Sequence, residues 1–311
     1  MSGNNGASPS LTGILCIDKP ADFTSFDVVA KMRGILRTRK IGHGGTLDPM
    51  ATGVLPIFVG RATKACDILP DQDKRYTARF RLGVETDTQD CTGTVLAERP
   101  VTATSAQVEA ALEQFRGPIA QVPPMYSAVR VEGKRLYELA RSGVEVERKP
   151  RDITVYSLEL LEADEARHEY SIDIACSKGT YVRTICHDIG QLLGCGAAMT
   201  ALRRTRACGY ELEQCVTLEQ LQKLRDSDRL ESVLLPTDSA FARYDRLELD
   251  ERQTRLFRNG VPLALSRMKL PARDGSGVRR IYGHDGAFLA IAQTDWERDA
   301  LVSHKRFDLP Q

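Results

Sequence analysis

The strictest pattern of hydrophobic and polar positions along the chain is an alternation of period two between residues 76 and 82. Apolar side chains fall on one face of this segment, at Tyr76, Ala78, Phe80 and Leu82. Polar side chains fall on the other face, at Thr77, Arg79 and Arg81. Because successive side chains of a strand point to opposite faces, the pattern predicts a strand with one buried face. Tyr76 then lies on the buried side, as expected of a core tyrosine.

Apolar residues at helical spacing predict elements on both sides of this strand. A helix is expected to begin with Ser25 as its cap and to run through Ile35. Further helices are predicted from Ser105, from near Thr180, and over residues 136–141, 218–224 and 251–258. Strands are predicted over residues 13–18, 153–161, 169–176, 278–282, 288–292 and 301–307. Helices and strands are therefore mixed along the whole chain.

A glycine-rich segment between residues 41 and 56 follows neither period. It reads Ile-Gly-His-Gly-Gly-Thr-Leu-Asp-Pro-Met-Ala-Thr-Gly-Val-Leu-Pro and holds one histidine, His43, and one carboxylate, Asp48. Pro49 biases Asp48 toward an extended backbone, and glycines permit positive φ or the close approach of another molecule. The apolar run over residues 54–59 predicts a buried strand behind the loop. Two interpretations stay open: a place for chemistry built on Asp48, or a tight turn whose aspartate caps its own backbone.

Composition narrows the class of protein. The 311 residues suffice for one large domain or two, with 42% apolar and 27% charged residues. No run of eighteen apolar residues occurs, so we expect no transmembrane helix and no membrane partner. Residues 1–11 are rich in Ser, Gly and Asn and are expected to form a disordered tail rather than a signal peptide.

The eight cysteines predict neither a disulfide framework nor a metal site. No two of them form a C-x-x-C pair, and Cys16, Cys66, Cys176 and Cys186 stand inside apolar runs, where cysteine acts as a small hydrophobe. Without a secretion signal, reduced thiols in a cytoplasmic protein are the expected state. The five histidines are scattered, so we predict no structural zinc.

The positions of the charged residues along the chain are more informative than the net charge. The formal net charge of +1 taken alone argues against a nucleic-acid partner, but distribution matters more than the sum. Five basic residues between Lys31 and Lys40 lead into the glycine-rich segment, and further clusters lie at residues 134–135, 148–151 and 203–206. Each cluster alone is typical of a solvated face. Residues 121–143 combine tyrosines with lysine and arginines, a composition typical of surfaces that grip RNA.

Arg183 is predicted in the first turn of the helix that begins near Thr180, where the helix dipole disfavours a cation. It therefore needs a partner, most simply a carboxylate. The alternative is a surface salt bridge, worth roughly 0–1 kcal/mol.

The glycine-rich segment is also the first of several motifs that resemble one family. Lys19-Pro20 and the run from Gly42 to Gly53 closely resemble the active-site signature of the TruB family of tRNA pseudouridine-55 synthases. Four further stretches match the same family in the same order: Asp73-Lys-Arg-Tyr76, Pro123-Pro-Met-Tyr-Ser-Ala128 with Gly133-Lys-Arg-Leu-Tyr137, Ser177-Lys-Gly-Thr-Tyr-Val-Arg183, and Leu202-Arg-Arg204. The resemblance covers residues 12 to 245 and extends more weakly to the end. Gly44 departs from it, because the family commonly carries threonine there.

The resemblance implies a role for each matching residue. Asp48 corresponds to the catalytic aspartate, and Arg183 to the arginine that pairs with it and contributes to substrate binding. Substrate-contacting positions correspond to His43, Tyr76, Tyr181 and Leu202, and Lys19 of the Lys-Pro pair is grouped with them. On this basis Tyr76 becomes a platform on which an extruded base stacks, which displaces its interpretation as a core tyrosine. His43 would fill the space that the base vacates, so His43→Phe should be partly tolerated.

The implied reaction breaks the N1–C1′ bond of a uridine, turns the uracil and joins C5 to C1′. Nothing is oxidised and no group leaves, so no cofactor and no metal is expected. Arg183 would keep Asp48 charged in a dry site. Whether Asp48 attacks C1′, adds to C6 or removes the 2′ proton stays open. Residues 203–206 and the basic helix before the loop would hold phosphates.

The resemblance also implies the architecture and the partner. We expect an α+β catalytic domain over residues 12–245, built on a mixed, mainly antiparallel sheet flanked by helices, with a thumb-like insert at about 123–150. A small β-rich, PUA-like module over residues 246–311 would add RNA binding. The expected partner is the T-arm stem-loop of tRNA, bound by a monomer with no obligatory protein partner. Two alternatives remain: an RNA-binding chaperone that folds tRNA, and a guide-RNA-dependent pseudouridine synthase.

Overall fold

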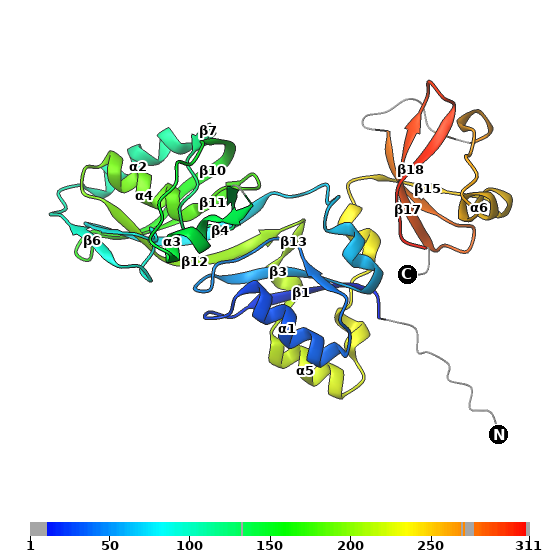
Figure 1. Ribbon diagram of the computed structural model, residues 1–311, viewed down its shortest axis with the longest axis horizontal. Coiled ribbons are helices and arrows are strands. Elements are labelled where there is room, and N and C mark those ends of the chain that lie inside the picture. The colour runs from blue at the N-terminus through cyan, green and yellow to red at the C-terminus, as the bar shows by residue number, and fades with distance from the viewer. Residues whose placement is uncertain (1–10, 132, 269, 271–276, 309–311) are drawn as a thin grey trace.

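The computed structural model describes residues 11–131, 133–268, 270 and 277–308. Most of the tail predicted for residues 1–11 lies outside the described residues. Figure 1 shows most of the chain as one long twisted sheet with helices on it, and a smaller β-rich unit at one end. This arrangement confirms the predicted α+β fold with a mixed sheet.

The large sheet has the strand order β14-β1-β3-β12-β4-β11-β10-β7, with β2 paired to β3 and β13 paired to β12. Its pairs are antiparallel except β1–β14 and β3–β12, which are parallel. Its strands are β1 (Gly13–Lys19), β2 (Ile41–His43), β3 (Thr52–Val59), β4 (Lys74–Leu82), β7 (Gly117–Gln121), β10 (Arg151–Asp164), β11 (Glu169–Cys176), β12 (Ala197–Ala207), β13 (Tyr210–Glu211) and β14 (Cys215–Val216). Two short hairpins stand apart from it, β5 (Val84–Thr86) with β6 (Val95–Glu98), and β8 (Arg130–Val131) with β9 (Lys134–Arg135).

Two groups of helices bury the sheet. The α-helices are α1 (Ser25–Leu36), α2 (Ser105–Leu112), α3 (Leu136–Arg141), α4 (Val182–Leu192), α5 (Leu218–Asp226) and α6 (Glu251–Arg258). Short 3-10 helices are η1 (Gly60–Ala65), η2 (Glu113–Phe115), η3 (Leu212–Gln214), η4 (Leu230–Val233), η5 (Thr237–Phe241) and η6 (Leu265–Arg267). Apolar residues of α1 and α5 pack on β1 and β3, whereas those of α2 and α4 pack on β4, β10 and β11.

The alternation that predicted β4 is confirmed. Its apolar face is buried, with Tyr76 6% exposed and Phe80 fully enclosed, while Arg79 and Arg81 are exposed. The start of α1 differs from the prediction by one residue. Thr24, rather than Ser25, is the cap, because its hydroxyl accepts from Asp27 N–H while the Asp27 carboxylate accepts from the Thr24 backbone. Ser25 is thereby free for another contact.

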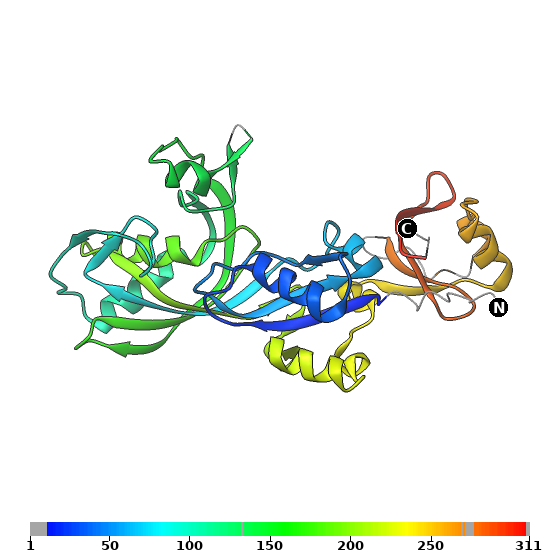
Figure 2. The ribbon, with the colours of Figure 1, turned by 60° about the horizontal axis from the view of Figure 1, so that its bottom comes forward.

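Two parts of the chain project from the large sheet. The segment between β7 and β10, which we call the thumb (residues 123–150), stands away from the sheet in Figure 2. The C-terminal unit is a four-stranded sheet of β15 (Asp245–Glu248), β16 (Val278–Tyr282), β17 (Phe288–Asp295) and β18 (Ala300–Arg306), with α6 beside it. The rings of Phe288 and Phe307 meet Phe241 of η5.

All eight cysteines are free. Cys16, Cys176 and Cys186 are buried and Cys66 is half-buried, as their apolar surroundings in the sequence indicate. Nowhere in the described ranges is a helix long and apolar enough to cross a membrane.

Candidate active site

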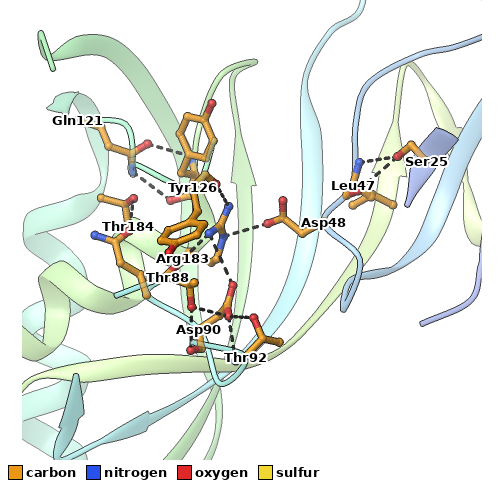
Figure 3. A network of polar contacts seen from close by, with 12 residues as sticks. Ser25, Leu47, Asp48, Thr88, Asp90, Thr92, Gln121, Tyr126, Arg183 and Thr184 are labelled. Atoms are coloured by element: carbon orange, nitrogen blue, oxygen red, sulfur yellow. Dashed lines mark hydrogen bonds and ion pairs between the residues drawn. The ribbon is translucent and has the colours of Figure 1, made fainter. Parts of the chain in front are cut away.

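The signature segment forms a loop, residues 44–51, between the antiparallel strands β2 and β3. The buried strand predicted from the apolar run over residues 54–59 is confirmed as β3, whereas β2 shows no strand periodicity in its sequence. The loop is tied to the start of α1 through Ser25, whose hydroxyl accepts from Leu47 N–H at 2.8 Å and lies 3.3 Å from the Leu47 carbonyl. Figure 3 shows this contact next to Asp48. Because Thr24 caps the helix, the hydroxyl of Ser25 is available to bond the loop.

Two fully buried cations hold the loop from behind. Lys19 donates to the carbonyls of Pro20 at 2.8 Å, Phe23 at 2.5 Å and Pro49 at 3.1 Å. Burial lowers the pKa of Lys19 to about 8, against an opposing attraction from Asp48. This geometry makes Lys19 a support for the residue after Asp48. A direct contact with substrate stays a prediction.

Arg204 is the second buried cation. Its guanidinium donates to the carbonyls of Val54 at 2.8 Å, Thr46 at 3.2 Å and Gly45 at 3.0 Å. The side chain is 0% exposed, so the prediction that this arginine holds phosphate is wrong. The charge instead satisfies loop carbonyls that a sharp turn leaves without backbone partners.

The neighbours of Arg204 are paired within the protein. Arg203 pairs with Asp18 at 2.8 Å, and Arg206 pairs with Asp71 at 3.0 Å. Both remain partly open to solvent. The alternation of β12 turns Arg203 and Arg204 to opposite faces, and an irregularity in its register between Arg204 and Arg206 leaves Arg206 on the surface.

Asp48 and Arg183 meet across the sheet. Arg183 Nε lies 2.9 Å from Asp48 Oδ2, and the two side chains are 5% and 36% exposed. The remaining guanidinium nitrogens donate to the carbonyls of Thr88 and Tyr126, each at 2.9 Å. Figure 3 shows the guanidinium surrounded by these three segments. The predicted carboxylate partner is confirmed, and burial excludes a surface salt bridge.

Asp90 is a second carboxylate on Arg183 that the sequence did not single out. Its Oδ2 lies 3.6 Å from Arg183 Nη1, and the residue is 4% exposed. Its Oδ1 accepts from the hydroxyls of Thr88 and Thr92 and from Thr92 N–H. The hydroxyl residues on both sides of Asp90 were the available signal, but only the fold brings this polar loop to Arg183.

The other predicted residues surround the loop at different depths. Tyr76 packs in the same apolar cluster as Leu47, and burial raises the pKa of Tyr76 to about 12. Leu202 of β12 is 7% exposed and belongs to that cluster. Tyr181 directly precedes α4, and its backbone N–H and carbonyl both bond the Gln121 side-chain amide.

His43 ends β2 and lines a cavity of about 290 Å³ together with Gly44, Gly45 and Lys74. Its Nδ1 accepts from Gly45 N–H at 3.3 Å. Burial and then the nearby Arg204 charge lower the pKa of His43, so the ring is neutral at pH 7. A neutral planar ring fits the predicted role of filling space better than that of a proton donor. Among the described residues, no three His, Cys, Asp or Glu side chains come together to hold a metal ion.

Fold and site together define a pseudouridine synthase, and comparison with known proteins gives the family. The model for the N-terminal domain of TruB family pseudouridylate synthase matches residues 33–182, and that for the tRNA pseudouridylate synthase B C-terminal domain matches residues 183–242. The chain is 44% identical to tRNA pseudouridine synthase B of Stutzerimonas stutzeri, over 95% of each chain. It is 41% identical to the protein of that name from Clostridium tetani, over 94% of this chain and 99% of the relative. The chain belongs to the TruB family.

A solved structure with the same fold is a chain of a Cbf5-Nop10-Gar1 complex, with a TM-score of 0.73 and 26% identity. A chain of an H/ACA RNP bound to a substrate RNA containing 2′-deoxyuridine gives a TM-score of 0.72 and 25% identity. Each alignment covers 96% of this chain and 85% of the other.

Proposed function

We propose that this protein is a tRNA pseudouridine(55) synthase, which isomerises the T-loop uridine at position 55 of tRNA. One observation carries the proposal: a carboxylate accessible at 36% is bound to a nearly enclosed arginine, on a loop held by two buried cations. The names of its relatives agree with this activity.

The residues of the site fit the steps of the isomerisation. The base must leave the T-loop stack, at a cost of a few kcal/mol that stacking on an aromatic ring recovers in part. Tyr76 would be this platform, with Tyr181 and Leu202 bordering the base and His43 in the space that it leaves. Asp48 would then act on the ribose or the base while Arg183 keeps it ionised in a site that the RNA closes to water.

The same proposal covers the parts that surround the site. Residues 12–245 would form the catalytic domain, residues 123–150 the thumb that closes on the T-arm stem-loop, and residues 246–311 a PUA-like module that adds contacts to RNA. We further propose that the enzyme works in the cytoplasm as a monomer, without metal, cofactor or obligatory protein partner.

The decisive experiment compares Asp48→Asn with wild type. Asn keeps the size of the side chain but removes the charge, so tRNA binding should survive while pseudouridine formation falls by a factor of about 10³ or more. Pseudouridine is mapped in a tRNA transcript after incubation with purified protein, and affinity is measured by filter binding. Asp226→Asn on the exposed side of α5 is the matched control and should leave both unchanged.

The outcomes separate the alternatives. Conversion retained by Asp48→Asn would contradict the role of Asp48. Wild-type protein that binds and folds tRNA without converting any uridine would favour the chaperone. Conversion that appears only after a guide RNA is added would favour the guide-dependent class. The similar Cbf5 chain was solved in a complex with Nop10 and Gar1.

A further inference from the structure

Gly44 in the catalytic loop is a glycine for reasons of space. Its φ lies outside the positive region that disfavours side chains, unlike Gly45 and Gly53. A Cβ built on Gly44 would, however, lie 2.8 Å from Cys208 Sγ and 3.3 Å from Phe58 Cε2. Real Cβ atoms essentially never approach another atom as closely as 2.8 Å. The space beside Gly44 is therefore occupied by the thiol of Cys208.

Cys208 has an unusual backbone. It follows β12 in the tight turn to β13, with φ of 55° at Cys208 and 80° at Gly209. Two consecutive positive φ values are typical of a type I′ turn, which favours Asn, Asp or Gly at its first position. A cysteine in the left-handed region is strained, because its Cβ crowds the following carbonyl oxygen. The turn alone therefore gives no reason for a cysteine.

The thiol makes a specific contact that offsets this strain. Cys208 Sγ lies 3.1 Å from the Gly44 carbonyl and donates to it, and the residue is 4% exposed. The Gly44 N–H donates in turn to the Pro56 carbonyl at 2.9 Å. Burial raises the pKa of the Cys208 thiol, so the donor stays protonated at neutral pH. Both backbone groups of Gly44 are thus fixed four residues before Asp48.

We propose that Cys208 is a positioning residue for the reaction and forms a size-matched pair with Gly44. The thiol fills the space of the missing side chain and fixes the carbonyl of Gly44. This contact sets the position of the loop backbone that carries Asp48. The inference rests on the proposed function, because its readout is uridine isomerisation.

The pair predicts that a side chain fits at residue 44 only when the one at residue 208 is removed. Gly44→Thr alone should lower the single-turnover rate at saturating tRNA by about 10-fold to 10²-fold, as expected when a catalytic group shifts by a fraction of an ångström to 1 Å. Cys208→Gly alone should lower the rate about 3-fold to 5-fold, because it removes the donor and the packing. The Gly44→Thr/Cys208→Gly double variant should be at least about 5-fold faster than Gly44→Thr, since residues in contact are not additive.

Three further measurements separate positioning from stability. Affinity for tRNA should stay within about 2-fold in all variants, because the effect acts on Asp48 in the bound complex. Cys208→Ser, which keeps a small donor, should retain the wild-type rate within about 2-fold. Cys195→Ala removes another nearly buried thiol, 3% exposed and located after α4. It is the matched control and should change the thermal midpoint without changing the rate.

The result that would overturn the inference is a double variant no faster than Gly44→Thr, in an assay in which wild type converts its uridine. An inactive wild type would instead contradict the proposed function. If Gly44→Thr does not fold, the cycle is repeated with Gly44→Ala, which adds only the Cβ that meets Sγ. Rescue by Cys208→Gly supports the pair there as well, and its absence rejects it.

Discussion

The loop that carries Asp48 (residues 44–51) and the thumb both contact Arg183, but they are built in opposite ways. The loop is fixed by interior groups, with Lys19 and Arg204 fully buried beneath it and Ser25 holding its middle. The thumb stands on the surface (Figure 2), with Lys134 and Arg135 exposed at the tip of a two-stranded hairpin. Its side chains contact one another at the surface, as where the guanidinium of Arg135 lies over the Tyr137 ring.

This difference separates two tasks. Chemistry needs a carboxylate held to a fraction of an ångström, and interior hydrogen bonds supply that. Gripping RNA needs accessible cations on a segment that can adapt. The two regions meet at Arg183, which binds Asp48 of the loop and the Tyr126 carbonyl at the root of the thumb. A thumb that closes on RNA, as we propose, would therefore act on the same guanidinium that holds Asp48.

Breaking this junction should have the largest effect. Arg183→Lys keeps the charge but cannot reproduce the planar fork that reaches Asp48, Thr88 and Tyr126 together. Turnover on bound tRNA should fall by about 10²-fold to 10³-fold, with affinity changed by less than about 5-fold. Single-turnover kinetics and filter binding measure the two. Lost affinity with normal turnover would make Arg183 a phosphate clamp instead of a support for Asp48.

Breaking the support of the loop should affect stability as well as rate. Arg204→Met leaves the carbonyls of Gly45, Thr46 and Val54 without donors in a buried place, which should cost about 3 kcal/mol of unfolding free energy. Urea denaturation measures the loss. Arg206→Met, two residues along on the surface, removes only its pair with Asp71 and should cost about 0–1 kcal/mol. Equal losses in the two variants would contradict the interior role of Arg204.

Changing the thumb should have a smaller effect, confined to binding. The Lys134→Ala/Arg135→Ala variant should weaken tRNA binding about 10-fold near 0.1 M salt and reduce the slope of affinity against salt by between one and two. Unfolding free energy should change by less than about 0.5 kcal/mol, because both side chains are exposed. If the unfolding free energy changes while the salt dependence of tRNA affinity does not, Lys134 and Arg135 stabilise the fold and do not bind RNA.

The smallest expected effect concerns His43 and pH. Because its pKa in the folded protein lies below 6.5, the unfolded chain binds the proton first as the pH falls through 6.5. Unfolding free energy should therefore decrease as the pH falls from 6.5 toward the lowered pKa of His43. His43→Phe should remove this decrease while retaining part of the activity. Denaturation of wild type and of His43→Phe is measured at pH 7.5 and pH 5.5. If both proteins show the same pH dependence, His43 is exposed to solvent rather than buried.

The sequence predicted elements with local periodicity best, as β4 shows. It also predicted that Arg183 needs a carboxylate, since a cation in a first helical turn is a local signal. Arg204 was misplaced because a run of arginines does not tell which ones a strand turns inward. Asp90 was missed because its partner lies 93 positions along the chain and only the fold brings them together. The cap was predicted one residue too late because Thr24 and Ser25 both carry a hydroxyl that can cap a helix.

The parallel pairing of β3 with β12 places Gly53 beside Arg204. A Cβ on Gly53 would lie 2.1 Å from the Arg204 carbonyl oxygen, and Gly53 has φ of +103°. Because the atoms that a Cβ would meet belong to the backbone, residue 53 must be glycine whatever side chain stands at residue 204. A chimera that takes the loop from one relative and β12 from another should therefore keep this close pairing of strands as long as residue 53 stays glycine.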